Sequence, residues 1–179
     1  MKRSGFKFKP RKPLKRSPFK RTTSPKVRSK LTKRELMPNR VKRAKKELVE
    51  LSHTFIRKRD SINDYEIKGY CFDCGILCEG MHFQAGHFEA DSVGGALLRY
   101  HPHNMHGQFS GCNMKTSQER VKINYTLKMI ERYGIERLNK IRALKNKSIK
   151  ADIIFYEKMV ELYKGGDEQK IIDYLETLC

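Results

Sequence analysis

The clearest chemical signal in the sequence is a pair of cysteines separated by two residues and followed by glycine. Cys71-Phe-Asp-Cys74-Gly has the spacing of a zinc knuckle, in which a tight turn aims both sulfurs at one point. One such pair needs further ligands, and Cys112 is the obvious third one. Cys78 or His82 is close enough along the chain to supply the fourth. The alternative is that these cysteines are buried free thiols.

A second signal is a histidine placed directly after two small residues, in Gln84-Ala-Gly-His87-Phe. A short strand at 82–88 would present this side chain to a cleft at the end of the strand. A neutral imidazole can take a proton from water that attacks phosphorus, which makes His87 a candidate general base. A single histidine is also often structural, and the sequence leaves that alternative open.

The third signal is Asn104-Met-His106-Gly-Gln108, which precedes Cys112-Asn113 at the expected start of a helix. In a strand at 103–108, alternation places Asn104, His106 and Gln108 on one face. The amide oxygen of Asn113 suits a hard divalent cation. The same residue could equally be an ordinary helix N-cap.

Taken together, a knuckle, a cleft histidine, a following asparagine and Cys-Asn at a helix start have the order found in His-Asn (HNH) nucleases. In that ββα-metal architecture, a β-hairpin and one helix hold a single metal ion. The ion stabilises charge on the phosphate while the histidine activates water. The sequence therefore predicts an α+β fold with a small HNH-like core, a zinc knuckle and flanking helices.

The apolar pattern supplies the surrounding elements. A stripe with steps of three and four predicts a helix at 39–60. A glycine-containing loop is expected at 89–102, and a helix from 117 that ends at Gly134. Further helices are expected at 135–145, 149–163 and 167–178, the last two separated by Gly165-Gly166. The predicted organisation is a tail (1–38), a helix leading into the core (39–66), the nuclease-like core (67–134) and C-terminal helices (135–179).

Positive charge is concentrated at the N-terminus. The net charge of the 179 residues is +19, and residues 1–50 contain 20 basic but only 3 acidic side chains. Such a block favours a polyanionic partner, with nucleic acid first and a membrane surface second. Residues 1–34 combine basic residues with prolines and contain no acidic residue, which predicts a disordered basic tail. The chain has no apolar run long enough to span a bilayer and no signal-peptide core, so a cytoplasmic, reducing location is expected.

The sequence also resembles a known family, the phage NinG (Rap) recombination endonucleases. The resemblance covers about residues 50–140. The matching segments are Phe55-Ile-Arg-Lys-Arg-Asp60, Cys71-Phe-Asp-Cys74-Gly, Ala85-Gly-His87-Phe, Leu98-Arg-Tyr, Asn104-Met-His106-Gly-Gln108, Cys112-Asn113 and Glu131-Arg-Tyr-Gly134. The resemblance implies a Mg²⁺- or Mn²⁺-dependent DNA endonuclease that acts on branched recombination intermediates such as D-loops and Holliday junctions. It also implies a phage or prophage origin and a role beside the recombination machinery.

Two positions depart from the family pattern. The family usually has a second pair of cysteines that ends in Cys-Asn, but here Phe109 occupies the first position of that pair. Only three of the four thiolates are therefore present, and the structural zinc needs Cys78 or His82 or is weakened. In addition, Gly86 precedes the candidate base where such enzymes often have a metal ligand. We expect His106, together with Asn113, to hold the catalytic metal instead.

The remaining roles follow from this hypothesis. Asn104 would orient His87 or stabilise the loop of the hairpin. Three basic residues near the start of the following helix would contact phosphates; they are Lys115, Arg120 and Lys122. The main rival is a non-catalytic, zinc-bearing nucleic-acid-binding protein, and an RNA-binding protein is a third possibility. A homodimer would suit two-fold symmetric junctions.

Overall fold

The computed structural model describes residues 33–63, 65–145, 147 and 149–178. The side chains of 33–36 and 91–94 are not described. The tail predicted at the N-terminus lies outside the described residues up to Thr32. The described part combines helices with two small antiparallel sheets, which confirms the α+β class.

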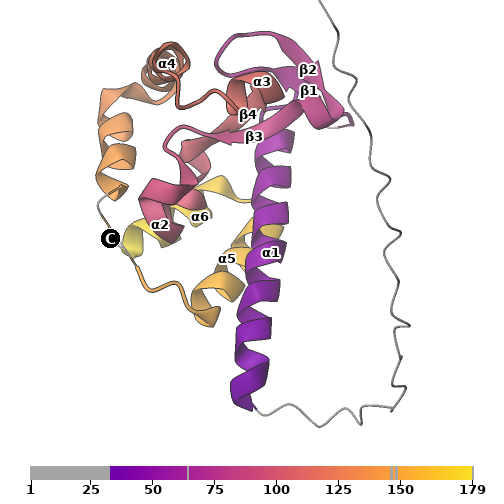
Figure 1. The fold of residues 1–179 in the computed structure, drawn as a ribbon, viewed down its shortest axis with the longest axis vertical. Helices are drawn as coiled ribbons and strands as arrows, with labels where there is room; N and C mark the ends of the chain where they lie inside the picture. The colour runs from indigo at the N-terminus through magenta and orange to yellow at the C-terminus, as the bar shows by residue number, and fades with distance from the viewer. Residues whose placement is uncertain (1–32, 64, 146, 148, 179) are drawn as a thin grey trace, which may run out of the picture. The chain divides into compact units, whose positions relative to one another are not determined.

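The long first helix, α1 (Lys33–Arg59), runs beside α5 (Ile153–Gly165), and the sheets lie at its C-terminal end (Figure 1). It begins before the predicted residue 39 and includes Pro38. Pro38 lies beyond the first turn of α1, where it cannot donate the backbone hydrogen bond that a residue at this position normally makes. The predicted apolar stripe of α1 forms its buried face. Ala44 and Leu48 are buried against α5. Burying a leucine side chain contributes about 1.5–3 kcal/mol to the stability of the folded state.

The first sheet pairs β1 (Lys68–Tyr70) with β2 (Leu77–Glu79). The second pairs β3 (Phe83–His87) with β4 (Met105–Phe109), close to the predicted strands. In its register Gly86 lies opposite His106 and His87 lies opposite Met105. A 3₁₀ turn (Gly80–His82) leads into β3 and another (Pro102–Asn104) leads into β4.

The long connection within the second hairpin differs from the prediction. A loop was expected at 89–102, but α2 (Asp91–Arg99) occupies most of it. Leu97 and Leu98 enter two different cores, so burial favours a helix here. Gly95 interrupts it with a φ of 61°, a conformation that glycine adopts without strain.

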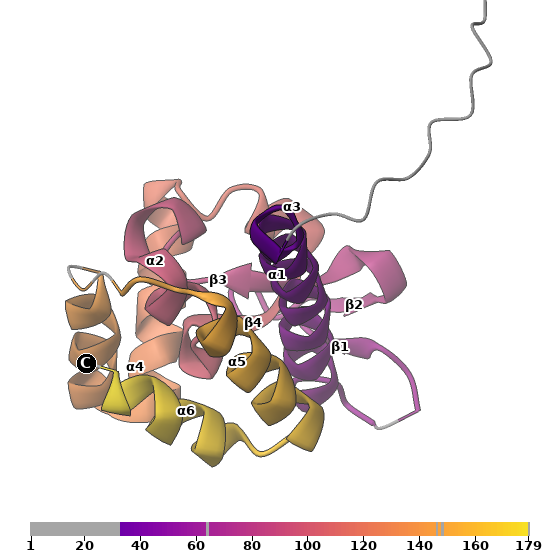
Figure 2. The same cartoon turned by 90° about the horizontal axis from the view of Figure 1, so that it is seen from below.

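Three further helices complete the described part. After β4 comes the short α3 (Ser110–Asn113), and then α4 (Glu119–Leu144). The predicted break at Gly134 is present as a φ of 80° inside α4. The last helix, α6 (Glu168–Thr177), follows α5 after a left-handed Gly166, and it lies beside α5 in Figure 2.

An ion-pair network joins the end of α1 to β4 and α4. The guanidinium of Arg59 donates to both carboxylate oxygens of Asp60, at 2.9 Å each, and to the carbonyl of Met105 at 2.8 Å. Asp60 also accepts from the backbone N–H of Gly107 at 2.8 Å and from Arg132 at 3.1 Å. Burial alone would raise the pKa of Asp60, but these bonds and charges hold it below its ordinary value. The network therefore fixes β4, the strand that connects Asn104 to α3.

Candidate functional site

A cluster of thiols stands where the knuckle was predicted. The sulfurs of Cys71, Cys74 and Cys112 all lie within 4.8 Å of one another, and those of Cys74 and Cys112 are 3.4 Å apart. The turn after β1 presents the first two, with Gly75 at a φ of 72°, and α3 presents the third. Zinc–sulfur bonds of about 2.3 Å place thiolates roughly this far apart, so the cluster could hold a metal such as zinc.

Neither of the two residues suggested as the fourth ligand belongs to this cluster in the part of the chain that the structure describes. The thiol of Cys78 is directed to backbone carbonyls, of Gly69 at 3.4 Å and of Ile76 at 3.6 Å. His82 is exposed, and its Nδ1 lies 3.5 Å from Ser110 Oγ. Burial raises the pKa of Cys78 to about 11, which keeps it a thiol at neutral pH.

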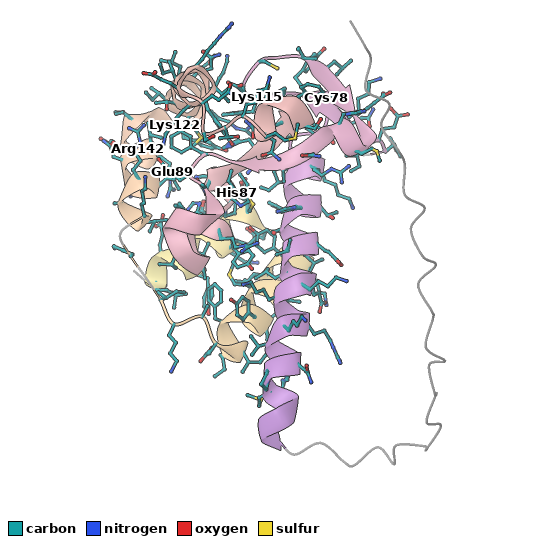
Figure 3. The ribbon with its side chains drawn as sticks, in the orientation of Figure 1. Cys78, His87, Glu89, Lys115, Lys122 and Arg142 are labelled. Atoms are coloured by element: carbon teal, nitrogen blue, oxygen red, sulfur yellow. The ribbon has the colours of Figure 1, made fainter. Side chains whose placement is uncertain are left out.

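A cleft of about 380 Å³ brings His87 and Asn113 together. It lies between the end of β3 and the start of α4, and in Figure 3 His87, Glu89 and Lys122 mark its position. The complete lining consists of His87, Phe88, Glu89, Ala90, Asn113, Thr116, Ser117, Lys122 and Lys145. The cleft therefore combines an imidazole, a carboxylate, an amide and two ammonium groups.

The hydrogen bond of His87 determines its tautomer. Its Nε2 lies 3.0 Å from the carbonyl oxygen of Arg99, at the end of α2. Because a carbonyl only accepts, Nε2 must carry the proton, and Nδ1 is the basic nitrogen of the neutral ring. A histidine held in this way has the donor and acceptor arrangement of a general base.

Glu89 is the acidic cleft residue that the sequence analysis missed, and Lys145 beside it was missed as well. Glu89 is only 5% exposed, and its carboxylate lies 3.5 Å from the ammonium of Lys122 and 3.3 Å from that of Lys145. Its only sequence signal was an acidic residue two positions after His87, inside a segment interpreted as a loop. The helical connection that buries it could not be predicted from that signal.

Asn104 is completely buried and holds the backbone of Glu89. Its Oδ1 accepts from the Glu89 N–H at 3.0 Å, and its Nδ2 donates to the Glu89 carbonyl at 3.1 Å and to the Leu98 carbonyl at 3.0 Å. These bonds close the connection between β3 and β4. Asn104 therefore acts on the cleft through Glu89 and α2, since its side chain bonds to the backbone of the connection between β3 and β4.

Asn113 is the last residue of α3, so the alternative that it caps a helix N-terminus is wrong. Its Nδ2 donates to Gln84 Oε1 at 3.0 Å. A Cβ added to Gly86 would lie 1.7 Å from Gln108 Oε1 and 2.9 Å from Asn113 Oδ1. A larger residue at position 86 would thus displace the side-chain amides of Gln108 and Asn113.

His106, expected beside Asn113 as a metal ligand, is instead enclosed in an aromatic cluster. Its Nδ1 lies 3.0 Å from the Tyr125 hydroxyl and its Nε2 lies 2.9 Å from the Tyr133 hydroxyl. Its ring stacks on Phe72 with centroids 3.9 Å apart. Burial holds its pKa well below the ordinary value. Both ring nitrogens are already hydrogen-bonded, so the structure does not bring His106 to the cleft.

The three basic residues expected to contact phosphate fall in different places. Lys122 lines the cleft, where it meets Glu89. Lys115 and Arg120 are exposed outside the residues that line the cleft, and the charge of Arg120 acts on the carboxyl of Asp73. Among the described residues, no helix is both long and apolar enough to cross a bilayer.

The chain is similar to a known protein family. The model of the family described as "NinG: Bacteriophage Lambda NinG protein" matches residues 6–169. No curated protein and no solved structure matches the chain.

Proposed function

Because the chain belongs to the NinG family of bacteriophage lambda, we propose that it is a phage recombination protein whose cleft hydrolyses DNA phosphodiester bonds with Mg²⁺ or Mn²⁺. The observation that carries this proposal is the meeting of His87, Glu89 and Asn113 with two lysines in one cleft. A basic imidazole nitrogen, oxygen ligands and ammonium groups are the parts that metal-assisted phosphoryl transfer needs.

The hairpin and its helices support an HNH-like arrangement. β3 ends at the candidate base, β4 returns beside it, and α3 follows β4 directly. Asn104 fixes the connection between the strands, as a hairpin that must hold a catalytic histidine requires. The insertion of α2 into that connection supplies the Arg99 carbonyl that orients His87.

Five of the cleft residues have a defined part in the proposed reaction. Nδ1 of His87 takes the proton from the attacking water. The Glu89 carboxylate and the Asn113 amide oxygen would hold the divalent cation, since hard cations prefer oxygen ligands. The bound cation would stabilise negative charge on the phosphate and the leaving oxygen. Lys122 and Lys145 neutralise Glu89 and would contact the phosphate backbone on either side.

The proposed substrate is branched DNA, such as a D-loop or a Holliday junction. Basic side chains bind phosphate without reading sequence, so DNA shape has to supply the selectivity. The excess of charge in residues 1–50 would add non-specific affinity. Action beside recombination enzymes, and as a homodimer on two-fold symmetric junctions, belongs to the same proposal.

The test compares cleavage of linear duplex, D-loop and four-way-junction DNA, with and without Mg²⁺ or Mn²⁺. We expect metal-dependent cutting of the branched substrates, with the rate reduced about 10²–10⁴-fold in His87→Ala because a general base contributes that much. Glu89→Gln should raise the metal concentration needed for half-maximal cutting. His82→Ala and Glu131→Gln are the matched controls, because both residues are exposed outside the cleft.

The results also decide between the proposal and its rival. If the wild-type protein binds branched DNA tightly but cuts none of the substrates with either metal, the chain is a non-catalytic, zinc-bearing DNA-binding protein. If cutting survives His87→Ala unchanged, another group is the base. Tighter binding to RNA than to every DNA would favour the third possibility, an RNA-binding protein.

A further inference from the structure

A pocket of about 250 Å³ shares no lining residue with the cleft and has no part in the proposed reaction. It is lined by Arg59, Asp60, Ser61, Tyr70, Phe72, Gly107 and Arg132. These residues belong to the end of α1 and the two positions after it, to β1 and the turn that follows, to β4 and to α4. Drug-sized ligands occupy pockets of about 300–1,000 Å³, so this smaller pocket suits a group of one or two rings.

The buried charges of this pocket are paired, and its exposed charge is positive. The carboxylate of Asp60 is only 7% exposed and is hydrogen-bonded to both Arg59 and Arg132. The side chain of Arg132 is 39% exposed, and among the described residues its only ion-pair partner is Asp60, at 3.1 Å. A guanidinium has five N–H donors in one plane, so Arg132 is held in place by this contact and keeps donors for a ligand.

Two aromatic side chains line the pocket together with this guanidinium. The ring of Phe72 is half-buried, and the guanidinium carbon of Arg132 lies 5.8 Å from its centroid. Tyr70, the last residue of β1, is 60% exposed. Bases of single-stranded nucleic acids stack on exposed rings beside arginines, because every base has a flat π-face and the cation adds a further attraction. The pocket therefore has the chemistry of a nucleobase site.

Stacking restricts such a site to unpaired bases. In a duplex, neighbouring base pairs cover both faces of each base, so a protein ring can stack on a base only after it has left the helix. A D-loop contains a displaced single strand whose bases are already available. The pocket is also close to the candidate base in the sheet register, since Gly107 pairs with Ala85, two positions before His87 and about 7 Å along β3. Both sites are therefore built on one hairpin.

We propose that this pocket binds an unpaired base of branched DNA, with Tyr70 as the stacking ring and Arg132 as the cation beside it. The inference rests on the proposed function for its choice of DNA as the partner, and it gives the selectivity for branches a source. Duplex arms are bound through their phosphates, whereas an unpaired base adds stacking. A branch with a single-stranded arm should therefore be preferred over a linear duplex of equal charge.

The test measures how much the bases of a single-stranded arm contribute to binding. The probe is a fluorescently labelled forked DNA with one unpaired arm, compared with the same fork whose unpaired arm is abasic. Both forks carry the same phosphates, so the contribution of the basic N-terminus cancels in the ratio of the two affinities at one salt concentration. Anisotropy is recorded on the full chain without added Mg²⁺ or Mn²⁺, so binding is measured independently of cutting.

The wild-type protein should bind the normal fork about 5–150-fold more tightly than the abasic fork, which is the contribution of one stacked base. Tyr70→Ser should reduce this ratio to near one by weakening only the binding of the normal fork. Arg132→Lys should lower the ratio as well, because lysine keeps the charge but lacks the planar guanidinium. Tyr65→Ser is the matched control and should keep the wild-type ratio, since Tyr65 is 97% exposed and does not line the pocket. Circular dichroism monitors the folding of each variant.

Four results would overturn the proposal. These are a wild-type ratio near one, an unchanged ratio in Tyr70→Ser, an equal loss in Tyr65→Ser, and tighter binding of a fork whose unpaired arm is RNA of the same sequence. The last result would assign the pocket to RNA. The proposed function fails on a different observation, the absence of metal-dependent cutting, which would leave the ratio of the two fork affinities as it is.

Discussion

Replacing Asn104 by alanine should unfold the connection that carries the cleft. The amide makes three hydrogen bonds to backbone groups of Glu89 and Leu98, and it is completely buried. Alanine leaves the N–H and the carbonyl of Glu89 without these partners, whereas the Leu98 carbonyl still accepts from the His101 N–H at 3.3 Å. Each buried unpaired group is unfavourable by about 1–3 kcal/mol, so the two groups predict a loss of about 2–6 kcal/mol, and we expect about 3 kcal/mol in the free energy of unfolding.

The measurement is urea unfolding followed by circular dichroism, supported by thermal unfolding. For a chain of this size a loss of about 3 kcal/mol corresponds to a decrease in Tm of roughly 6–12 °C. Asn104→Asp should be as harmful, because an acceptor then faces the carbonyls of Glu89 and Leu98 that the amide donor served. Asn139→Ala is the matched control, since Asn139 is exposed on α4 and should change stability by less than about 0.5 kcal/mol. A loss below about 1 kcal/mol in Asn104→Ala would refute the reasoning.

Burial lowers the pKa of His101 to about 3 and that of His103 to about 4, from an ordinary value of 6.5. As the pH falls, these histidines are therefore protonated in the unfolded chain at a higher pH than in the folded protein. The free energy of unfolding should therefore be steady above about pH 6.5 and fall from there toward about pH 4; a flat profile in urea titrations would contradict this. Gly86→Ala should destabilise the protein by about 1–3 kcal/mol through its clash with Gln108, and adding Gln108→Ala should restore part of the loss in the same assay. Asp60→Asn should remove about 1.5–3 kcal/mol at neutral pH, because Arg59 loses its charged hydrogen bonds to Asp60 and keeps Glu168 as its remaining carboxylate partner. Its native carboxyl has a lowered pKa, so this contribution is present above about pH 3.9 and is lost as the pH falls through the native pKa; equal acid unfolding profiles for the variant and the wild type would count against it.

The hairpin and the helices were predictable from the sequence because local signals specify them. The alternation around Gln84 and His106 gave strands close to β3 and β4. Glycine marked the interruption at Gly134 and the left-handed end of α5 at Gly166. In each case the period or the backbone preference of a few neighbouring residues is sufficient.

The residues that complete the candidate site depend on contacts between distant segments. Glu89 is drawn into the cleft because Asn104 holds its backbone from 15 residues away. The strand pattern predicted His106 to be a metal ligand, but both of its ring nitrogens are hydrogen-bonded to the hydroxyls of Tyr125 and Tyr133 of α4. Periodicity says which face of a strand a side chain takes and does not say which helix will cover that face. The sequence therefore predicted the backbone of the site better than its ligands.

The packing of α1 against α5 has a consequence for the order in which the chain is made. The apolar stripe of α1 is complete at Arg59, but its main partner begins at Ile153. At about 5–20 residues per second, translation leaves that stripe uncovered for roughly 5–20 s. Exposed lysines and arginines beside the stripe repel neighbouring copies of the same positively charged nascent chain. The positive charge to which we assign DNA binding in the proposed function would thus also reduce aggregation of an unfinished core during synthesis.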